Sequence, residues 1–137
     1  MSLAILTPED KDDAVALWTT CGLTVPWNDA FVDFDRALDT QTSTVLGLKE
    51  GETLIGTVMV GYDGHRGWMY YLAVDPAHQQ AQHGKRLVKA AENWLREQDC
   101  PKVQLMVRSS NSSVIGFYQA LGYKDDDVLV LSRRFVP

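Results

Sequence analysis

Cysteine is scarce in this sequence. The 137 residues include only Cys21 and Cys100, which lack the spacing of metal ligands and are too few for a disulfide framework. We therefore expect reduced thiols, no bound metal and a cytoplasmic location. No apolar run approaches the roughly 18–20 residues of a membrane span, so no membrane partner is predicted. The opening residues, MSLAILTPEDKDD, do not read as a signal peptide.

An excess of positive charge is also absent. Thirteen Lys and Arg side chains stand against eighteen Asp and Glu side chains, which gives a formal net charge of −5. Such a chain has no general attraction to phosphate backbones, so we expect no nucleic-acid partner. The composition, 45% hydrophobic and 23% charged, is that of a globular protein. The length predicts a single domain, residues 1–137, with its own core.

Hydrophobic periodicity and turn residues predict an alternation of strands and helices. Thr7 followed by Pro8, with Asp10 beyond, marks a helix start, and Asn28 or Asp29 can cap a second helix. The predicted strands are 3–6, 44–48, 53–62, 68–75, 103–107 and 128–135, and the later helices are 83–98 and 109–121. This order is typical of a mixed α/β domain built on one sheet.

A strand that runs into a helix is the first candidate for chemistry. The strand predicted to end at Asp75 is followed by a helix that opens near Gly84, Lys85 and Arg86. Unpaired N–H groups at a helix N-terminus, together with the helix dipole, attract phosphate. The alternative is an ordinary turn with a solvated polar start.

A second segment, NSSVIGFYQALGY at 111–123, favours the phosphate site. With Val74-Asp75-Pro76 before it, its spacing resembles the pattern N-x-x-A-x-x-x-Y-x-x-x-G-F/Y of the GNAT family of acyl-CoA-dependent N-acetyltransferases. The matching residues are Asn111, Tyr118, Gly122 and Tyr123. Val114 stands where alanine is usual. The string GYDGHRG at 61–67 resembles most closely the small bacterial YpeA-like members.

The resemblance implies the GNAT acyl-CoA N-acyltransferase fold, in which helices flank a mixed central sheet with splayed parallel strands. It implies that acetyl-CoA lies between the strands at 68–75 and 103–107, and homodimers are common in the family. The residues that it assigns to acetyl-CoA are Leu72, Ala73, Val74, Gln79, Gln80, Ala81, Gln82, His83, Gly84, Lys85, Asn111 and Tyr118. Pairing of the pantetheine arm with a strand edge agrees with this placement.

The pyrophosphate loop departs from the family pattern at one position. The family has Q/R-x-x-G-x-G/A, and residues 79–84 read QQAQHG, so Gln82 replaces the middle glycine. A left-handed backbone angle at a residue with a side chain would cost ~1 kcal/mol or more. The substitution therefore predicts weaker CoA binding. The alternative is that the Gln82 amide bonds to a phosphate.

Tyr118 is the catalytic acid that the resemblance implies. Acetyl transfer expels a thiolate, and with a thiol pKa of ~8.5 and a Tyr pKa of ~10 a phenol can protonate it at neutral pH. The alternative is that Tyr118 only packs on the core. The strand at 68–74 has no carboxylate, so Asp63 and His65 in the preceding turn are the nearest candidates for the base. A water chain could serve instead, and His65 could be a solvated turn residue.

The acceptor is expected to border four residues, namely Trp27, Asn28, Asp29 and Tyr70. The carboxylates at 125–127 could attract an amine or form a solvated turn. The sequence thus predicts an N-acetyltransferase that moves an acetyl group from acetyl-CoA to a primary amine of a small molecule or a protein. The alternatives are a catalytically weak CoA-binding or sensing domain, and an interaction module with a dimer surface at Trp27 and Trp68.

Overall fold

A five-stranded sheet organises the first part of the chain, as described over residues 1–79 and 81–137 of a computed structural model. Of Ala81 the backbone alone is described. The strands, in sheet order, are β1 (Ser2–Ile5), β2 (Ser43–Glu50), β3 (Thr53–Tyr62), β4 (Gly67–Val74) and β5 (Val103–Gln104). Neighbours pair antiparallel as far as β4, and β4 pairs parallel with β5. The mixed sheet predicted from the sequence is confirmed.

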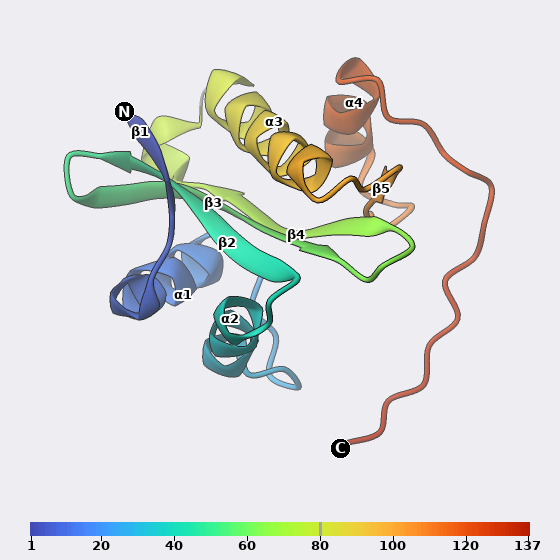
Figure 1. The fold of residues 1–137 in the computed structure, drawn as a ribbon, viewed down its shortest axis with the longest axis horizontal. Coiled ribbons are helices and arrows are strands. Elements are labelled where there is room, and N and C mark those ends of the chain that lie inside the picture. The colour runs from blue at the N-terminus through green and yellow to red at the C-terminus, as the bar shows by residue number, and fades with distance from the viewer. Residues whose placement is uncertain (80) are drawn as a thin grey trace. The chain divides into compact units, whose positions relative to one another are not determined.

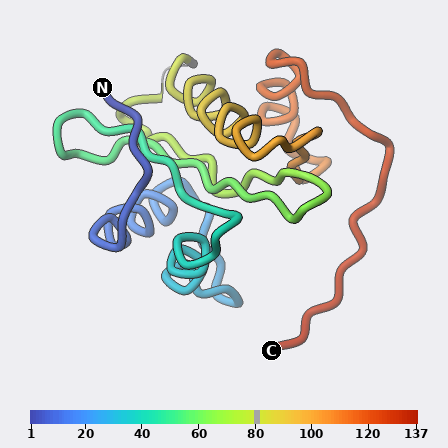
Figure 2. The backbone as a smooth tube through the Cα atoms, viewed as in Figure 1, coloured from blue at the N-terminus to red at the C-terminus, as the bar shows by residue number. Residues whose placement is uncertain are grey.

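Helices cover both faces of this sheet. Helices α1 (Lys11–Thr20) and α2 (Ala30–Asp39) lie on one face and α3 (Ala81–Glu97) lies on the other, as Figure 1 and the backbone trace in Figure 2 show. Trp18 of α1 and Phe34 of α2 are fully buried in the core of the first face. Complete burial of an apolar side chain of this size contributes roughly 1.5–3 kcal/mol.

Glycine allows α3 to approach β4 closely. A Cβ atom on Gly67 would lie 2.8 Å from both methyl carbons of Leu95 and 3.0 Å from the sulfur of Cys100. These distances are shorter than van der Waals contact. Leu95 and Leu87 of α3 are buried against the sheet, so Gly67 and Met69 of β4 face α3, and the alternating Trp68 and Tyr70 face the side of α1 and α2.

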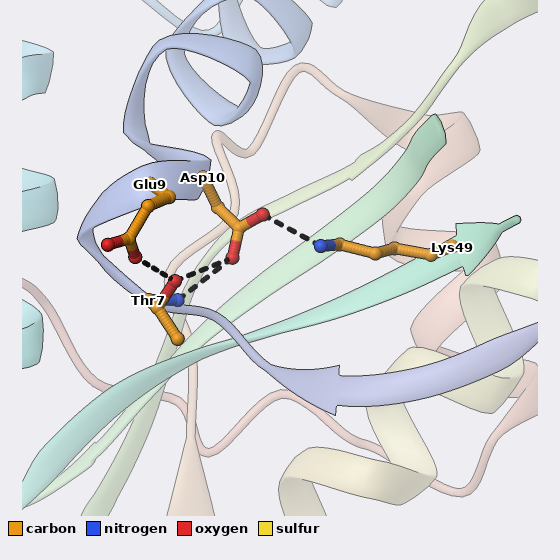
Figure 3. Close-up of polar contacts among 4 residues, drawn as sticks. All are labelled: Thr7, Glu9, Asp10 and Lys49. Atoms are coloured by element: carbon orange, nitrogen blue, oxygen red, sulfur yellow. Dashed lines mark hydrogen bonds and ion pairs between the residues drawn. The ribbon is translucent and has the colours of Figure 1, made fainter. Parts of the chain in front are cut away.

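The start of α1 follows the sequence prediction. Thr7 is the N-cap of a single turn of 3-10 helix, Pro8–Asp10, that leads into α1. The Thr7 N–H donates to Asp10 Oδ2 over 2.9 Å, its hydroxyl donates to Glu9 Oε2 over 2.6 Å, and Lys49 Nζ of β2 lies 2.8 Å from Asp10 Oδ1 (Figure 3). These contacts tie the helix start to β2 of the sheet.

The chain divides by its internal contacts into two compact units, Met1–Leu105 and Met106–Pro137. The second unit contains α4 (Ser112–Ala120), which ends before Gly122 at φ +94. The strand predicted at 128–135 is wrong, because residues 128–137 form no strand. Val, Leu and Phe favour strands only where a partner backbone pairs with them, and no ladder within the described residues includes this segment. The strand predicted at 103–107 is shorter, Val103–Gln104.

Candidate active site

One edge of β4 has no strand partner beyond its first two residues, within the described chain. The parallel ladder between β4 and β5 consists, in the described chain, of the pairs Gly67↔Val103 and Trp68↔Gln104. Beyond Trp68, β4 keeps β3 as its strand partner within the unit Met1–Leu105. The splayed parallel strands predicted for this fold are thus confirmed. An open edge of this kind presents backbone N–H and C=O groups with which an extended ligand can pair.

A bulge interrupts β4 at this open edge. Thr57 pairs with Ala73 and Met59 pairs with Tyr70, so the single residue between the partners on β3 faces Tyr71 and Leu72 on β4. Tyr71 adopts a left-handed backbone with φ +51, which costs a residue with a side chain about 1–2 kcal/mol. A bulge leaves an extra residue outside the ladder and bends the strand. The open edge therefore carries backbone groups that the ladder with β3 does not use.

Helix α3 begins shortly after β4 ends. It starts at Ala81, two residues earlier than predicted, so Gln82 and His83 lie in its first turn with Gly84 and Lys85 close behind. The N–H groups of a first helical turn have no partner within the helix. Gln82 belongs to the regular helix and has no positive φ. The strain considered for Gln82 from the sequence is therefore not present, because a helical backbone needs no glycine there. Gln80, assigned to the same loop, lies outside the described residues.

The carbonyl at the end of β4 is already engaged. Gln79 Nε2 donates to Val74 O over 3.1 Å, and the thiol of Cys21, the C-cap of α1, donates to the same oxygen over 3.3 Å. Burial and the charge of Asp75 raise the pKa of the Cys21 thiol, which keeps its proton. A carbonyl has two lone pairs. A ligand amide that donates to Val74 would therefore compete with the Gln79 amide.

The turn between β3 and β4 holds both candidates for the base. Asp63 Oδ1 accepts the N–H groups of Arg66 at 2.7 Å and His65 at 2.8 Å, and its Oδ2 accepts Trp68 Nε1 at 3.2 Å. The backbone bonds from Arg66 and His65 lower the pKa of Asp63 below its ordinary value. Asp63 is therefore a weaker proton acceptor than a free aspartate. The His65 side chain is exposed to solvent.

The expected acceptor residues lie on the side of α1 and α2. Asp29 is the N-cap of α2, and its Oδ1 accepts the N–H groups of Phe31 and Val32 over 3.0 and 3.2 Å. Trp27 and Asn28 precede it in an exposed loop. Tyr70 is 43% exposed, and partial burial and the charge of Asp63 raise its pKa. Asp29 thus has a capping role that does not depend on any ligand.

Asn111 and Tyr118 belong to the second unit. Asn111 is the N-cap of α4, and its Oδ1 accepts the Val114 N–H and the Ser113 hydroxyl, each over 3.3 Å. Tyr118 is 8% exposed, with the rings of Phe117 and Tyr123 edge-on at 5.1 and 5.5 Å. Burial raises the pKa of Tyr118 to about 12. Tyr118 is therefore a protonated phenol at neutral pH.

A group of buried and half-buried residues beside the bulge was not among the site candidates from the sequence. The Trp18 ring stacks on Tyr71, with centroids 3.9 Å apart and planes inclined by 12°. Trp18 Nε1 donates to Thr57 Oγ1, and the Tyr71 hydroxyl donates to Asp33 Oδ2 over 2.7 Å. These residues are far apart in the sequence, and no short motif joins them. The aromatic density of the strand at 68–75 was the only signal.

The described residues offer neither a metal-binding cluster nor a membrane-spanning helix. Within residues 1–79 and 81–137, no group of three or more His, Cys, Asp or Glu side chains is arranged to hold a metal ion. No helix in this described part has both the length and the apolar character needed to cross a membrane.

Comparisons with known proteins agree with this geometry. Residues 8–123 match the Acetyltransferase (GNAT) family. A Yersinia pestis (strain Pestoides F) protein named acetyltransferase is 37% identical over 136 residues, which are 99% of this chain and 96% of that protein. This chain belongs to the GNAT family of acetyltransferases.

Solved structures share the fold at lower identity. A putative acetyltransferase from Agrobacterium tumefaciens str. C58 superposes with a TM-score of 0.83 at 17% identity, covering 98% of this chain and 100% of that chain. The aminoglycoside N-acetyltransferase AAC(6')-Iy in complex with CoA gives a TM-score of 0.84 at 15% identity, covering 98% and 94%. The GNAT fold predicted from the sequence is confirmed.

Proposed function

We propose that this protein transfers the acetyl group of acetyl-CoA directly to a primary amine of a small molecule or a protein. The observation that carries the proposal is the bulged, open edge of β4 that leads within a few residues into the N-terminus of α3. An open strand edge suits the amides of a pantetheine arm, and a helix N-terminus suits a pyrophosphate. Leu72, Ala73 and Val74 would pair with the arm.

The phosphate end of the ligand is assigned to the start of α3. The N–H groups of Gln82 and His83 fall in the first helical turn, and Gly84 and Lys85 follow. The helix dipole and the Lys85 charge both favour an anion there. The family pattern assigns Asn111 to the pantetheine arm.

The transfer needs one proton donor and one proton acceptor. The neutral amine attacks the thioester carbonyl, a C–N bond forms, the C–S bond breaks, and the thiolate leaves with the electron pair. Tyr118 is proposed to protonate that thiolate, and its raised pKa keeps the phenol protonated and ready to donate. The amine nitrogen, cationic in water, must lose a proton before it attacks, and the exposed imidazole of His65 is proposed to accept it. Asp63, with its lowered pKa, is the weaker candidate.

The acceptor is assigned to the side of α1 and α2. A primary amine arrives as a cation, which the carboxylates of Asp29 and Asp63 attract and an aromatic face such as Trp27 can bind. Tyr70 and Asn28 would complete this side. Arg66 would repel an acceptor whose only charge is positive. An acceptor that carries both an amine and a carboxylate would be attracted by the aspartates through its amine and by Arg66 through its carboxylate.

A second candidate function is a CoA-binding or sensing domain with little turnover. The absence of any carboxylate from β4 and the three hydrogen bonds that occupy Asp63 favour it. It predicts CoA binding without transfer to any amine.

One experiment separates the two functions. A panel of amine acceptors is incubated with acetyl-CoA, and free thiol release is followed while calorimetry measures CoA binding. The enzyme predicts one site per chain and acceptor-dependent release, whereas the sensor predicts binding alone. Absence of binding at millimolar CoA would contradict both functions.

Tyr118→Phe tests the acid once an acceptor is found. Removal of the hydroxyl should lower turnover by about 10²–10⁴-fold and leave CoA binding intact, because only the proton donor is lost. Tyr123→Phe is the matched control, since it removes a hydroxyl from a neighbouring ring at a position where the family pattern accepts Phe. Turnover of Tyr118→Phe equal to that of the control would leave Tyr118 a packing residue.

A further inference from the structure

We propose that Trp18, Asp33, Thr57 and Tyr71 form a clamp that fixes the bulge of β4, and that Thr57 and Tyr71 are thereby positioning residues for the pantetheine arm. The inference rests on the proposed function, since it concerns the edge at which the arm binds. It assigns a role at the site to four residues, from α1, α2, β3 and β4, that were not candidate site residues from the sequence.

The carbonyl of Tyr71 is held by a buried relay. Thr57 Oγ1 donates to Tyr71 O over 2.9 Å. Thr57 Oγ1 in turn accepts the N–H of Trp18 Nε1 over 2.8 Å. Trp18 and Thr57 are both fully buried. A hydroxyl can donate one hydrogen bond, and Thr57 donates its own to Tyr71 O. A lone pair of the same Thr57 hydroxyl accepts the hydrogen bond from the Trp18 N–H. The bonds therefore fix both the threonine rotamer and the direction of the Tyr71 carbonyl.

The side chain of Tyr71 is held as well. Its ring stacks on Trp18, and its hydroxyl reaches Asp33 Oδ2 of α2 over 2.7 Å. Burial and the bond to the Asp33 carboxylate raise the pKa of Tyr71, so the phenol keeps its proton. Tyr71 is thus anchored at its carbonyl, its ring and its hydroxyl. These contacts offset the cost of the left-handed backbone at a residue other than glycine.

The position of the clamp gives it a role beyond packing. The bulge begins at Tyr71, three residues past Trp68, which makes the last β4–β5 pair, and therefore lies within the open edge. Side chains and backbone groups alternate along a strand, so a shift of one residue reverses every group that follows. The conformation of Tyr71 therefore decides which N–H and C=O groups of Leu72, Ala73 and Val74 face the open edge. The N–H groups at the start of α3 are oriented by the helix itself and do not depend on Tyr71 in the same way.

The test compares two ligands that share a pyrophosphate. CoA carries the pantetheine arm and ADP does not. Calorimetry on the full-length protein should show that Thr57→Val weakens CoA binding by about tenfold or more and changes ADP binding little. Thr57→Ser restores the hydroxyl and should restore CoA affinity. Tyr71→Phe, which removes only the bond to Asp33, should weaken CoA binding relative to ADP binding by a smaller factor.

A control separates positioning from general destabilisation. Leu95→Ala removes buried volume from the last turns of α3, on the opposite face of the sheet from Trp18, and should lower the melting temperature while the ratio of CoA to ADP affinity stays as in the wild type. Equal weakening of both ligands by Thr57→Val, no weakening of either, or the same ratio change in Leu95→Ala would overturn the clamp. If the wild type transfers acetyl groups in any of these cases, the proposed function stands without it. A wild type that binds no CoA overturns both.

Discussion

Two threonines show how the same side chain acts differently in two regions of the molecule. Thr7 is exposed, and its bonds reach Glu9 and Asp10, two and three residues along the chain. Thr57 is fully buried, and its bonds join residues 14 and 39 positions away. The first network closes a local helix start, and the second sets the backbone of a distant strand. An exposed polar contact contributes little free energy, because water can replace either partner. A buried donor or acceptor that loses its partner has no water to replace it, so the free-energy cost is larger.

Replacement of the buried threonine should have the largest effect on stability. Thr57→Val leaves the Trp18 N–H and the Tyr71 carbonyl buried without their partner, which should cost ~2–4 kcal/mol in the free energy of unfolding. Urea unfolding measures the cost, and Thr57→Ser is the control that keeps the hydroxyl. A loss no larger than that of the same substitution at Thr7 would remove the distinction between the two regions.

The matched change at the exposed threonine should have a smaller effect. Thr7→Val removes the hydroxyl bond to Glu9 but keeps the N–H bond to Asp10 and an extended backbone that valine accepts. We expect a cost of about 0.5–1 kcal/mol by the same urea measurement. A cost near that of Thr57→Val would mean that the helix start is more tightly coupled to the fold than its exposure indicates.

The smallest effect should depend on pH. Partial burial opposes ionisation of Asp10, but the bonds from Lys49 and the Thr7 N–H outweigh it and lower its pKa. The carboxylate therefore stabilises the fold above its unfolded pKa of ~3.9, and this contribution disappears as the pH falls through the folded pKa. Asp10→Asn should cost at most about 1 kcal/mol at neutral pH, because the pair is partly exposed.

Thermal melts from neutral pH down to about pH 2 check this sign. The difference between the wild type and Asp10→Asn should shrink toward zero below about pH 3. A difference that persists or grows in acid would show that the amide, rather than the lost charge, destabilises the variant.

The same contrast explains what could be predicted from the sequence. The Thr7-Pro8 helix start and the Asp29 cap are local and were identified correctly, as was the open-edged sheet. The left-handed Tyr71 could not be foreseen, because its causes come from α1, α2 and β3. The strand at 128–135 was predicted from the local residue pattern, and a local pattern does not supply a partner strand.

For two candidate site residues the sequence did not predict the surroundings that the structure shows. Asp63 was selected because it is a titratable group in a turn. Its oxygens accept three hydrogen bonds that no sequence pattern predicted. Gln82 was expected to strain a loop, but the helix begins early enough to include it. In both cases the missing information was the direction of backbone N–H groups, which depends on where an element starts.

Amide hydrogen exchange tests most directly whether the open edge of β4 binds the acyl arm. Acetyl-CoA should slow exchange within Tyr70–Val74 and in the first turn of α3, because the bound arm and the pyrophosphate take up those N–H groups. Residues Ser2–Ile5 of β1, at the opposite edge of the sheet, provide an internal comparison and should not change. Exchange in β4 that is unaffected by acetyl-CoA, or protected no more than in β1, would contradict the account.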